Sequence, residues 1–135
     1  KVCSGNGLIK FHHVEIHSKV LQPGDPFVAR ILFDSDVDYL DAEVDIAIST
    51  SNEVSSHFQA TNRAYKKVIN FKKENKSLII RINDIRVNNA TGNIHIAIWA
   101  HNREELLFWC MVPLEFKAVE YATGNTFLDV FYDII

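Results

Sequence analysis

The length, composition and charge of the chain are those of one ordinary globular domain. It has 135 residues, of which 47% are hydrophobic and 23% are charged, and these proportions exclude a disordered chain. Its 14 Lys and Arg against 17 Asp and Glu give a net charge of −3, which argues against nucleic acid or an anionic membrane as the main partner. No apolar run is long enough to cross a bilayer. We expect residues 1–135 to form a single domain and, since the chain begins at Lys1, to be part of a longer protein.

Apolar and polar residues alternate with a period of two along most of the chain. This pattern predicts β-strands, because successive side chains of a strand point to opposite faces of its sheet. In chain order the predicted strands are residues 8–18, 27–34, 44–50, 55–62, 65–71, 78–83, 92–102, 106–119 and 127–134.

The segments between these strands are rich in turn residues, notably at 23–26, 88–92 and 122–125. No segment of ten or more residues combines helical spacing with helix caps, and residues 102–107 form one turn at most. The sequence therefore predicts an all-β protein, a β-sandwich of eight or nine mainly antiparallel strands.

The two cysteines, Cys3 and Cys110, are too few for the disulfide framework of a small secreted protein. We expect both to be reduced and unpaired.

The usual catalytic signatures are missing from the sequence. It has no phosphate-binding loop, no G-x-S-x-G, no H-E-x-x-H and no C-x-x-C. The glycines Gly5 and Gly7 precede a strand instead of opening a helix, which favours a turn over a nucleotide loop. We expect no catalytic residue and no cofactor in this domain.

One group of residues has the spacing of a metal site. If Val14 and Ile16 point inward, then His13, Glu15 and His17 share the outer face of one strand and could bind a metal together. The alternative, which we favour, is that all three are solvated residues on an exposed face.

Trp99 is the most informative residue for function. The inner face of its strand is already occupied by isoleucines, so alternation places Trp99 outside with His95 and His101. An outward tryptophan beside hydrogen-bonding side chains is typical of a platform on which a sugar ring stacks. The alternative is that Trp99 packs beneath a loop or against a partner subunit.

Four further residues are candidates for the same surface. Asp45 and Ser49 share the face if strand 44–50 lies beside strand 92–102, and Trp109 would border the groove. Arg103 follows the Trp99 strand and is a candidate partner for an anionic sugar terminus. Pro113 lacks an N–H group and marks its strand as an edge strand or a bulged one.

The order of these features resembles the C-terminal carbohydrate-binding domain of Wzt-type ATP-binding components of O-antigen ABC transporters. The similarity spans nearly the whole chain and lies in strand order and turns: Gly5-Asn6-Gly7-Leu8-Ile9, Val14-Glu15-Ile16, Gln22-Pro23-Gly24-Asp25-Pro26 with the strand after it, Ile46-Ala47-Ile48-Ser49-Thr50, Phe58 and Thr61, Thr91-Gly92-Asn93-Ile94, Leu114-Glu115-Phe116, and the segment from Gly124 to Phe131.

The resemblance implies an immunoglobulin-like β-sandwich that binds a finished polysaccharide at its modified non-reducing end. It also implies a homodimer that exchanges C-terminal strands, here through Phe127, Val130, Phe131 and Tyr132. An ATP-binding domain would precede this one in the full-length chain, which would contact the transporter's membrane subunit. The domain would lie in the cytoplasm at the inner face of the bacterial inner membrane.

Two other classes of protein stay open. One is a structural or adhesive immunoglobulin-like domain of a surface protein, which a bridge between Cys3 and Cys110 would favour. The other is a sandwich-fold enzyme that uses a metal at His13, Glu15 and His17.

Overall fold

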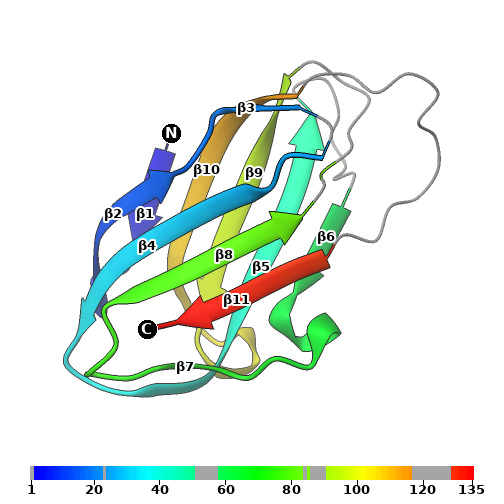
Figure 1. The fold of residues 1–135 in the computed structure, drawn as a ribbon. Helices are drawn as coiled ribbons and strands as arrows, with labels where there is room; N and C mark the ends of the chain where they lie inside the picture. The colour runs from blue at the N-terminus through cyan, green and yellow to red at the C-terminus, as the bar shows by residue number, and fades with distance from the viewer. Residues whose placement is uncertain (1, 23, 51–57, 84, 86–90, 117–128) are drawn as a thin grey trace.

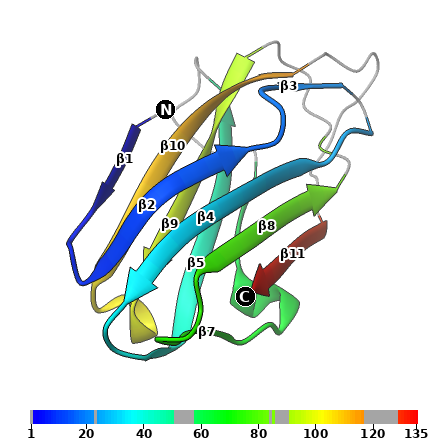
Figure 2. The same ribbon diagram turned by 60° about the vertical axis from the view of Figure 1, so that its left-hand side comes forward.

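The computed structural model describes residues 2–22, 24–50, 58–83, 85, 91–116 and 129–135. In these residues it contains a seven-stranded and a four-stranded sheet, which pack face to face (Figures 1 and 2). The predicted all-β sandwich is therefore confirmed.

The larger sheet combines the N-terminal strand with strands from the middle and later parts of the chain. Its main path runs in the order β1 (Val2–Gly5), β10 (Leu106–Phe116), β9 (Thr91–Trp99), β5 (Tyr39–Thr50) and β6 (Phe58–Thr61), with β3 (Val20–Leu21) beside β10 and β7 (Ile69–Phe71) beside β5. The smaller sheet has the order β11 (Asp129–Ile134), β8 (Ser77–Asn83), β4 (Phe27–Ser35) and β2 (Ile9–Ile16). Two short 3-10 helices, η1 (Asn62–Tyr65) and η2 (His101–Arg103), lie between strands.

The core lies between the two sheets and follows the period-two pattern of the sequence. In β9 the isoleucines Ile94, Ile96 and Ile98 are fully buried, as are Val44, Ile46 and Ile48 of β5. The opposite sheet contributes buried residues of β4 and β8, namely Phe27, Ala29, Ile31, Phe33, Leu78, Ile80 and Ile82. Burial of these apolar faces is the main driving force for this arrangement.

The structure corrects several predicted boundaries. The short strands β1 and β3 were not predicted, because two to four residues show too little alternation to reveal a period. Residues 62–65 form η1, so only the end of the predicted strand 65–71 is extended. Strand β5 begins at Tyr39, five residues before the predicted start.

Pro113 lies at a point of β10 where one side of the strand has no paired neighbour. On one side of β10, β1 pairs with residues Phe108 to Met111 and β3 pairs with Glu115 and Phe116, so Pro113 falls between the two partners. On its other side Pro113 faces Asn93 of β9. The missing N–H group therefore costs little, as expected for a proline at a partly open edge.

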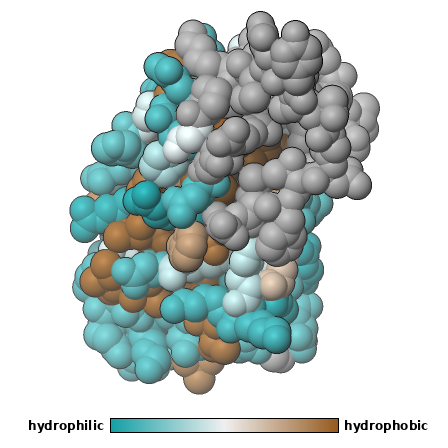
Figure 3. Space-filling view, turned by 45° about the vertical axis from the view of Figure 1, so that its right-hand side comes forward, coloured by the Kyte–Doolittle hydropathy of each residue, from teal (hydrophilic) through white to brown (hydrophobic). Residues whose placement is uncertain are grey.

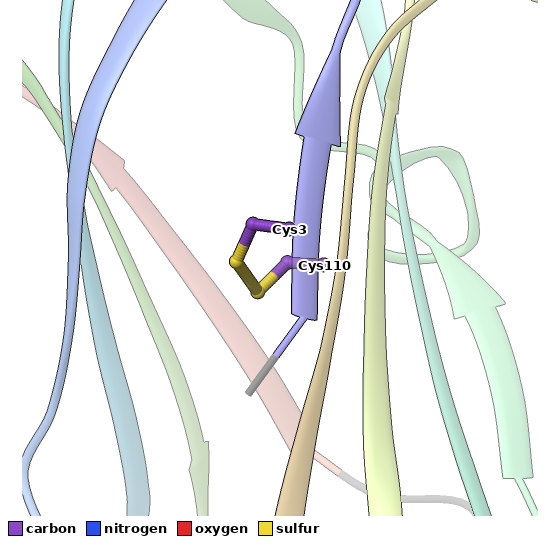
Figure 4. Close-up of a disulfide and its surroundings, with 2 residues drawn as sticks. All are labelled: Cys3 and Cys110. Atoms are coloured by element: carbon purple, nitrogen blue, oxygen red, sulfur yellow. A yellow bond between two sulfur atoms is a disulfide. The ribbon is translucent and has the colours of Figure 1, made fainter.

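The cysteines are paired, contrary to the expectation from composition. Cys3 of β1 lies directly opposite Cys110 of β10, with their Cα atoms 4.1 Å apart, and the structure joins their sulfur atoms in a disulfide (Figure 4). The prediction was wrong because the pairing depends on β1, which the sequence pattern did not reveal. The bridge fastens the N-terminal strand to the edge of the larger sheet.

The C-terminal strand β11 pairs antiparallel with β8 of the same chain. Val130 and Tyr132 point into the core, whereas Phe131 between them is 54% exposed. Burial raises the pKa of the Tyr132 phenol, and its hydroxyl donates to the Val44 carbonyl oxygen across the sandwich at 3.4 Å. Phe127 lies outside the described residues.

The surface around β6 and β11 shows hydrophobic patches separated by hydrophilic residues (Figure 3). Among the described residues, the exposed large apolar side chains include Leu40, Val68, Phe131 and Ile135. Across the described ranges, no helix has the length and hydrophobicity needed to traverse a bilayer.

The orientation of β11 leads to a prediction about stability. Replacing Tyr132 by Ala should lower the free energy of unfolding by about 3–5 kcal/mol, because the ring is 6% exposed and packs in the core. The neighbouring Phe131→Ala should change it by no more than about 0.5 kcal/mol, since that ring faces solvent. Urea denaturation followed by tryptophan fluorescence measures both. Equal losses for the two variants would contradict the inward orientation of Tyr132.

Candidate functional site

The outer face of the larger sheet brings together most of the residues that the sequence selected. Because Ile94, Ile96 and Ile98 are buried, His95, Ala97 and Trp99 of β9 point to the opposite side, where all three are half-buried. The predicted outward orientation of His95 and Trp99 is therefore correct.

Strand β9 lies between β5 and β10 (Figures 1 and 2). The register of the three strands aligns their outward residues. Ala97 faces Asp45 of β5 on one side and Trp109 of β10 on the other. Asp45 therefore lies beside the Trp99 strand, as predicted from the sequence. The small side chain of Ala97 is surrounded by larger ones, with His95 and Trp99 two residues away along the strand.

One end of this surface carries hydrogen-bonding groups from β5 and β9. The Ser49 hydroxyl lies 3.0 Å from Nε2 of His95. The ring centroids of His95 and Trp109 are 6.3 Å apart and their planes are tilted by 37°. Ser49, His95 and Trp109 therefore form one contiguous group across three strands.

The other end carries a network of charges centred on Arg103. Its Nε donates to Oε2 of Glu43 at 2.7 Å and its terminal NH2 group donates to Oδ2 of Asp45 at 3.1 Å. Its guanidinium carbon also lies 5.6 Å from the centre of the Trp99 ring. Burial opposes the charged form of Arg103, but the hydrogen bonds to Glu43 and Asp45 outweigh it and raise the pKa of Arg103 above its ordinary value.

A buried asparagine fixes the second arginine of the network. Asn62 is 1% exposed, accepts a hydrogen bond from the Val44 N–H and donates to the carbonyl oxygens of Ala42 and Lys67. These bonds hold η1 against β5. The next residue, Arg63, consequently reaches Glu43, with its Nε 3.3 Å from Oε1 of that carboxylate.

Two polar atoms of this surface are buried without a hydrogen-bond partner in the described structure: Oδ1 of Asp45 and Nε1 of Trp99. Asp45 is 8% exposed, and its other oxygen, Oδ2, is bonded to Arg103 and to Nε2 of Gln59 at 3.0 Å. An acceptor and a donor are thus left without a partner, on residues that are diagonal to each other across β5 and β9. Buried polar atoms are nearly always bonded in folded proteins, so such a pair is a feature expected of a ligand site.

Three residues of this network were missed by sequence reasoning. Glu43, Gln59 and Arg63 join Asp45 and Arg103, yet only Glu43 left a signal that could have revealed it. It continues the outward alternation of Ser49, Ala47 and Asp45 by one step, but the predicted strand began at Val44. Gln59 and Arg63 depend on contacts between separate elements.

Two predicted site residues differ from expectation, His101 in its position and Arg103 in its partners. His101 begins η2, beyond the end of β9, and its side chain lies outside the described part of the structure. Arg103, expected to be available to an anionic sugar terminus, is already bonded to two carboxylates.

His13, Glu15 and His17, whose spacing could have suited a metal, are not found as a metal-binding group. Within the described ranges no group of three His, Cys, Asp or Glu has a geometry that could hold a metal ion. Strand β2 ends at Ile16, so His17 lies just beyond it. The neighbouring His12 instead lies 2.7 Å from Oδ2 of Asp34, whose pKa is lowered by Lys76 and, second, by His12.

Comparisons with known proteins support the fold. No protein-family model matches the sequence, and no curated protein matches it. The structure is similar to the crystal structure of the C-terminal domain of Wzt, with a TM-score of 0.69 over 93% of this chain and 88% of that one. The two sequences are 11% identical, so the similarity establishes a shared fold and transfers no individual residue.

Proposed function

We propose that this domain is a non-catalytic carbohydrate-binding module of a bacterial polysaccharide exporter, and that it recognises the non-reducing end of an O-antigen polysaccharide. The observation that carries the proposal is the outer face of β10, β9 and β5, where two tryptophans flank a small residue between hydrogen-bonding side chains. Aromatic rings that stack on the apolar face of a sugar, beside groups that bond its hydroxyls, are the typical chemistry of such sites.

The arrangement suggests a role for each residue. A sugar ring over Ala97 would contact Trp109 on one side and Trp99 at one end. Ser49 and His95, already bonded to each other at 3.0 Å, would bond hydroxyl groups at the other end. Arg103 covers part of the Trp99 ring and holds Asp45 and Glu43 in place, and His101 lies next to this end of the surface.

The fold similarity to the C-terminal domain of Wzt supports the transport context. In this proposal an ATP-binding domain precedes the present one in the full-length chain and couples it to the membrane subunit. The domain then works in the cytoplasm, at the inner face of the inner membrane, and needs no cofactor of its own.

A titration with the O-polysaccharide of the source organism tests the binding function. We expect saturable binding that disappears when the non-reducing terminal residue is removed from the glycan. Trp99→Ala and Trp109→Ala should each weaken binding by about tenfold or more, since each removes a stacking surface. Calorimetry measures the affinity, with Phe131→Ala as a control because Phe131 is 54% exposed and lies on the smaller sheet.

Binding to neither form of the polysaccharide would refute the function. Binding that survives removal of the terminal residue would refute only recognition of the end.

We further propose that two copies of the domain pair by exchanging β11. The exchanged strand would carry Val130 and Tyr132 into the partner's core and leave Phe131 exposed, as it is within one chain. Phe127 would lie in the connection before the strand.

Removal of residues 127–135 tests this exchange. We expect a monomer with a large loss of stability, because the deletion removes two buried side chains and leaves β8 as an open edge. Light scattering measures the mass and urea denaturation measures the stability. A truncated protein that stays dimeric and equally stable would rule the exchange out.

One observation favours a second candidate, an interaction domain of a surface protein. The bridge between Cys3 and Cys110 is of a kind that persists in oxidising compartments and is rare in the cytoplasm. In that case Trp99 and Trp109 would belong to a protein interface, for which tryptophan is also well suited.

The thiol state of the protein in its source cells distinguishes the two candidates. Cells are lysed in acid, free thiols are alkylated, and the peptides containing Cys3 and Cys110 are identified by mass spectrometry. The export function predicts two alkylated cysteines, because the cytoplasm keeps thiols reduced. A quantitative bridge would instead favour the surface protein.

A further inference from the structure

We infer that the glycan leaves the candidate site across Trp109 and β1, and that Ser4 of β1 bonds a hydroxyl group of the second sugar from the bound end. The inference rests on the proposed carbohydrate-binding function and deepens it. It gives the bound chain a direction and adds a binding residue on a strand that alternation in the sequence did not reveal.

Outward residues of four strands form one row across the larger sheet. Asp45 of β5 lies opposite Ala97 of β9, and Ala97 lies opposite Trp109 of β10. Trp109 in turn lies opposite Ser4 of β1. Residues directly opposite each other in antiparallel strands have their Cβ atoms about 5 Å apart on the same face of the sheet. The candidate surface therefore extends one strand beyond Trp109, to β1 at the edge of the sheet (Figures 1 and 2).

The bridge between Cys3 and Cys110 determines which way Ser4 points. Cys110 is fully buried and joined to Cys3, so both side chains of the bridge lie on the inner side of the sheet (Figure 4). Because side chains alternate along a strand, Ser4 points to the outer side, as Trp109 does. Ser4 is exposed, and within the part of the chain that the structure describes its hydroxyl has no hydrogen-bond partner.

Strand β1 is held firmly against β10 although it is short. Its backbone pairs with β10 from Phe108 to Met111, and the Asn6 N–H donates to the carbonyl oxygen of Leu107 at 3.3 Å. A Cβ atom on Gly5 would lie 3.2 Å from the same oxygen, so the two backbones are close at this point. The disulfide adds a covalent link in the middle of the strand. Ser4 is thus positioned before a ligand binds, which lowers the entropic cost of binding.

The other end of the row is already occupied by hydrogen bonds between side chains. Asp45 accepts from Gln59 of β6 and from Arg103 of η2. A glycan that continued over β5 would have to displace Arg103 from this nearly buried carboxylate, at a considerable cost. In the opposite direction it crosses Trp109 and Ser4, whose side chains form no hydrogen bonds with other described residues. The route across β1 therefore leaves the charged network intact.

The spacing of the strands relates Ser4 to the second sugar and not to the first. Neighbouring strands lie about 4.8 Å apart, so β1 is about 10 Å from β9. A terminal sugar over Ala97 is separated from Ser4 by Trp109, whereas the next sugar, stacked on Trp109, lies within reach of it. A serine hydroxyl both donates and accepts, so it can bond a sugar hydroxyl in either role.

Two replacements of nearly equal shape test this contact. Ser4→Val and Ser4→Thr both introduce a β-branched side chain that suits a strand, but only threonine keeps the hydroxyl. The ligand is a trisaccharide that ends in the non-reducing terminal residue of the source organism's O-polysaccharide. In calorimetry Ser4→Val should bind it about threefold to tenfold more weakly, which is the effect of losing one hydrogen bond. Ser4→Thr should bind within about twofold of the wild type, because the hydroxyl is kept.

The terminal monosaccharide alone shows whether the contact is direct. It occupies only the position over Ala97, so the wild type and Ser4→Val should bind it equally in ligand-observed NMR. An equal loss for the monosaccharide and the trisaccharide would mean that the change disturbs the site as a whole, and would overturn the inference. A trisaccharide affinity unchanged in Ser4→Val would also overturn it and leave the carbohydrate-binding function intact. If the wild type bound neither the trisaccharide nor the intact polysaccharide, both would be overturned.

Discussion

The pairing of β5 with β9 is the constraint on which the rest of the structure depends. Val44, Ile46 and Ile48 face Ile98, Ile96 and Ile94 on the inner side of the sheet, and all six are fully buried. Since side chains alternate along a strand, a slip of one residue in either strand would place Asp45 or His95 in the core and isoleucines in water. The free energy of burying these six side chains therefore also fixes the outer surface. The same strand register therefore determines both the hydrophobic core and the candidate site.

The charged network at one end of that surface is rigid because several elements determine it together. Glu43 and Asp45 are each 8% exposed and stand on β5, whereas their partners come from η1 and η2. These ion pairs join nearly buried carboxylates to partly exposed arginines, and they contribute little net stability because desolvation offsets much of the attraction. They do hold side chains in one geometry, which lowers the entropic cost of binding a ligand. Sugar sites gain most from this effect, since each hydroxyl contributes only a small free energy.

The similarity to the C-terminal domain of Wzt shows that two very different sequences can adopt one fold. The TM-score is 0.69, yet the two sequences are only 11% identical. Packing needs only hydrophobic residues of suitable size at the inward positions. Outward positions are free to change with the ligand. A shared fold does not establish a shared function, so the candidate site is defined by this chain's own outer face.

The sequence by itself determined the fold class, most strands and the outward direction of His95, Trp99 and Asp45, because these depend only on a period of two that is visible within one segment. It could not determine β1 and the disulfide, whose partners are 107 residues apart. It also could not show that Arg103 is committed to Glu43 and Asp45, because a bond between β5 and η2 exists only once β9 lies beside β5. Local periodicity decided which way side chains point, and tertiary structure decided which of them meet. The physical reason is that alternation acts between adjacent residues, whereas ion pairs, bridges and open polar atoms depend on the register between distant strands.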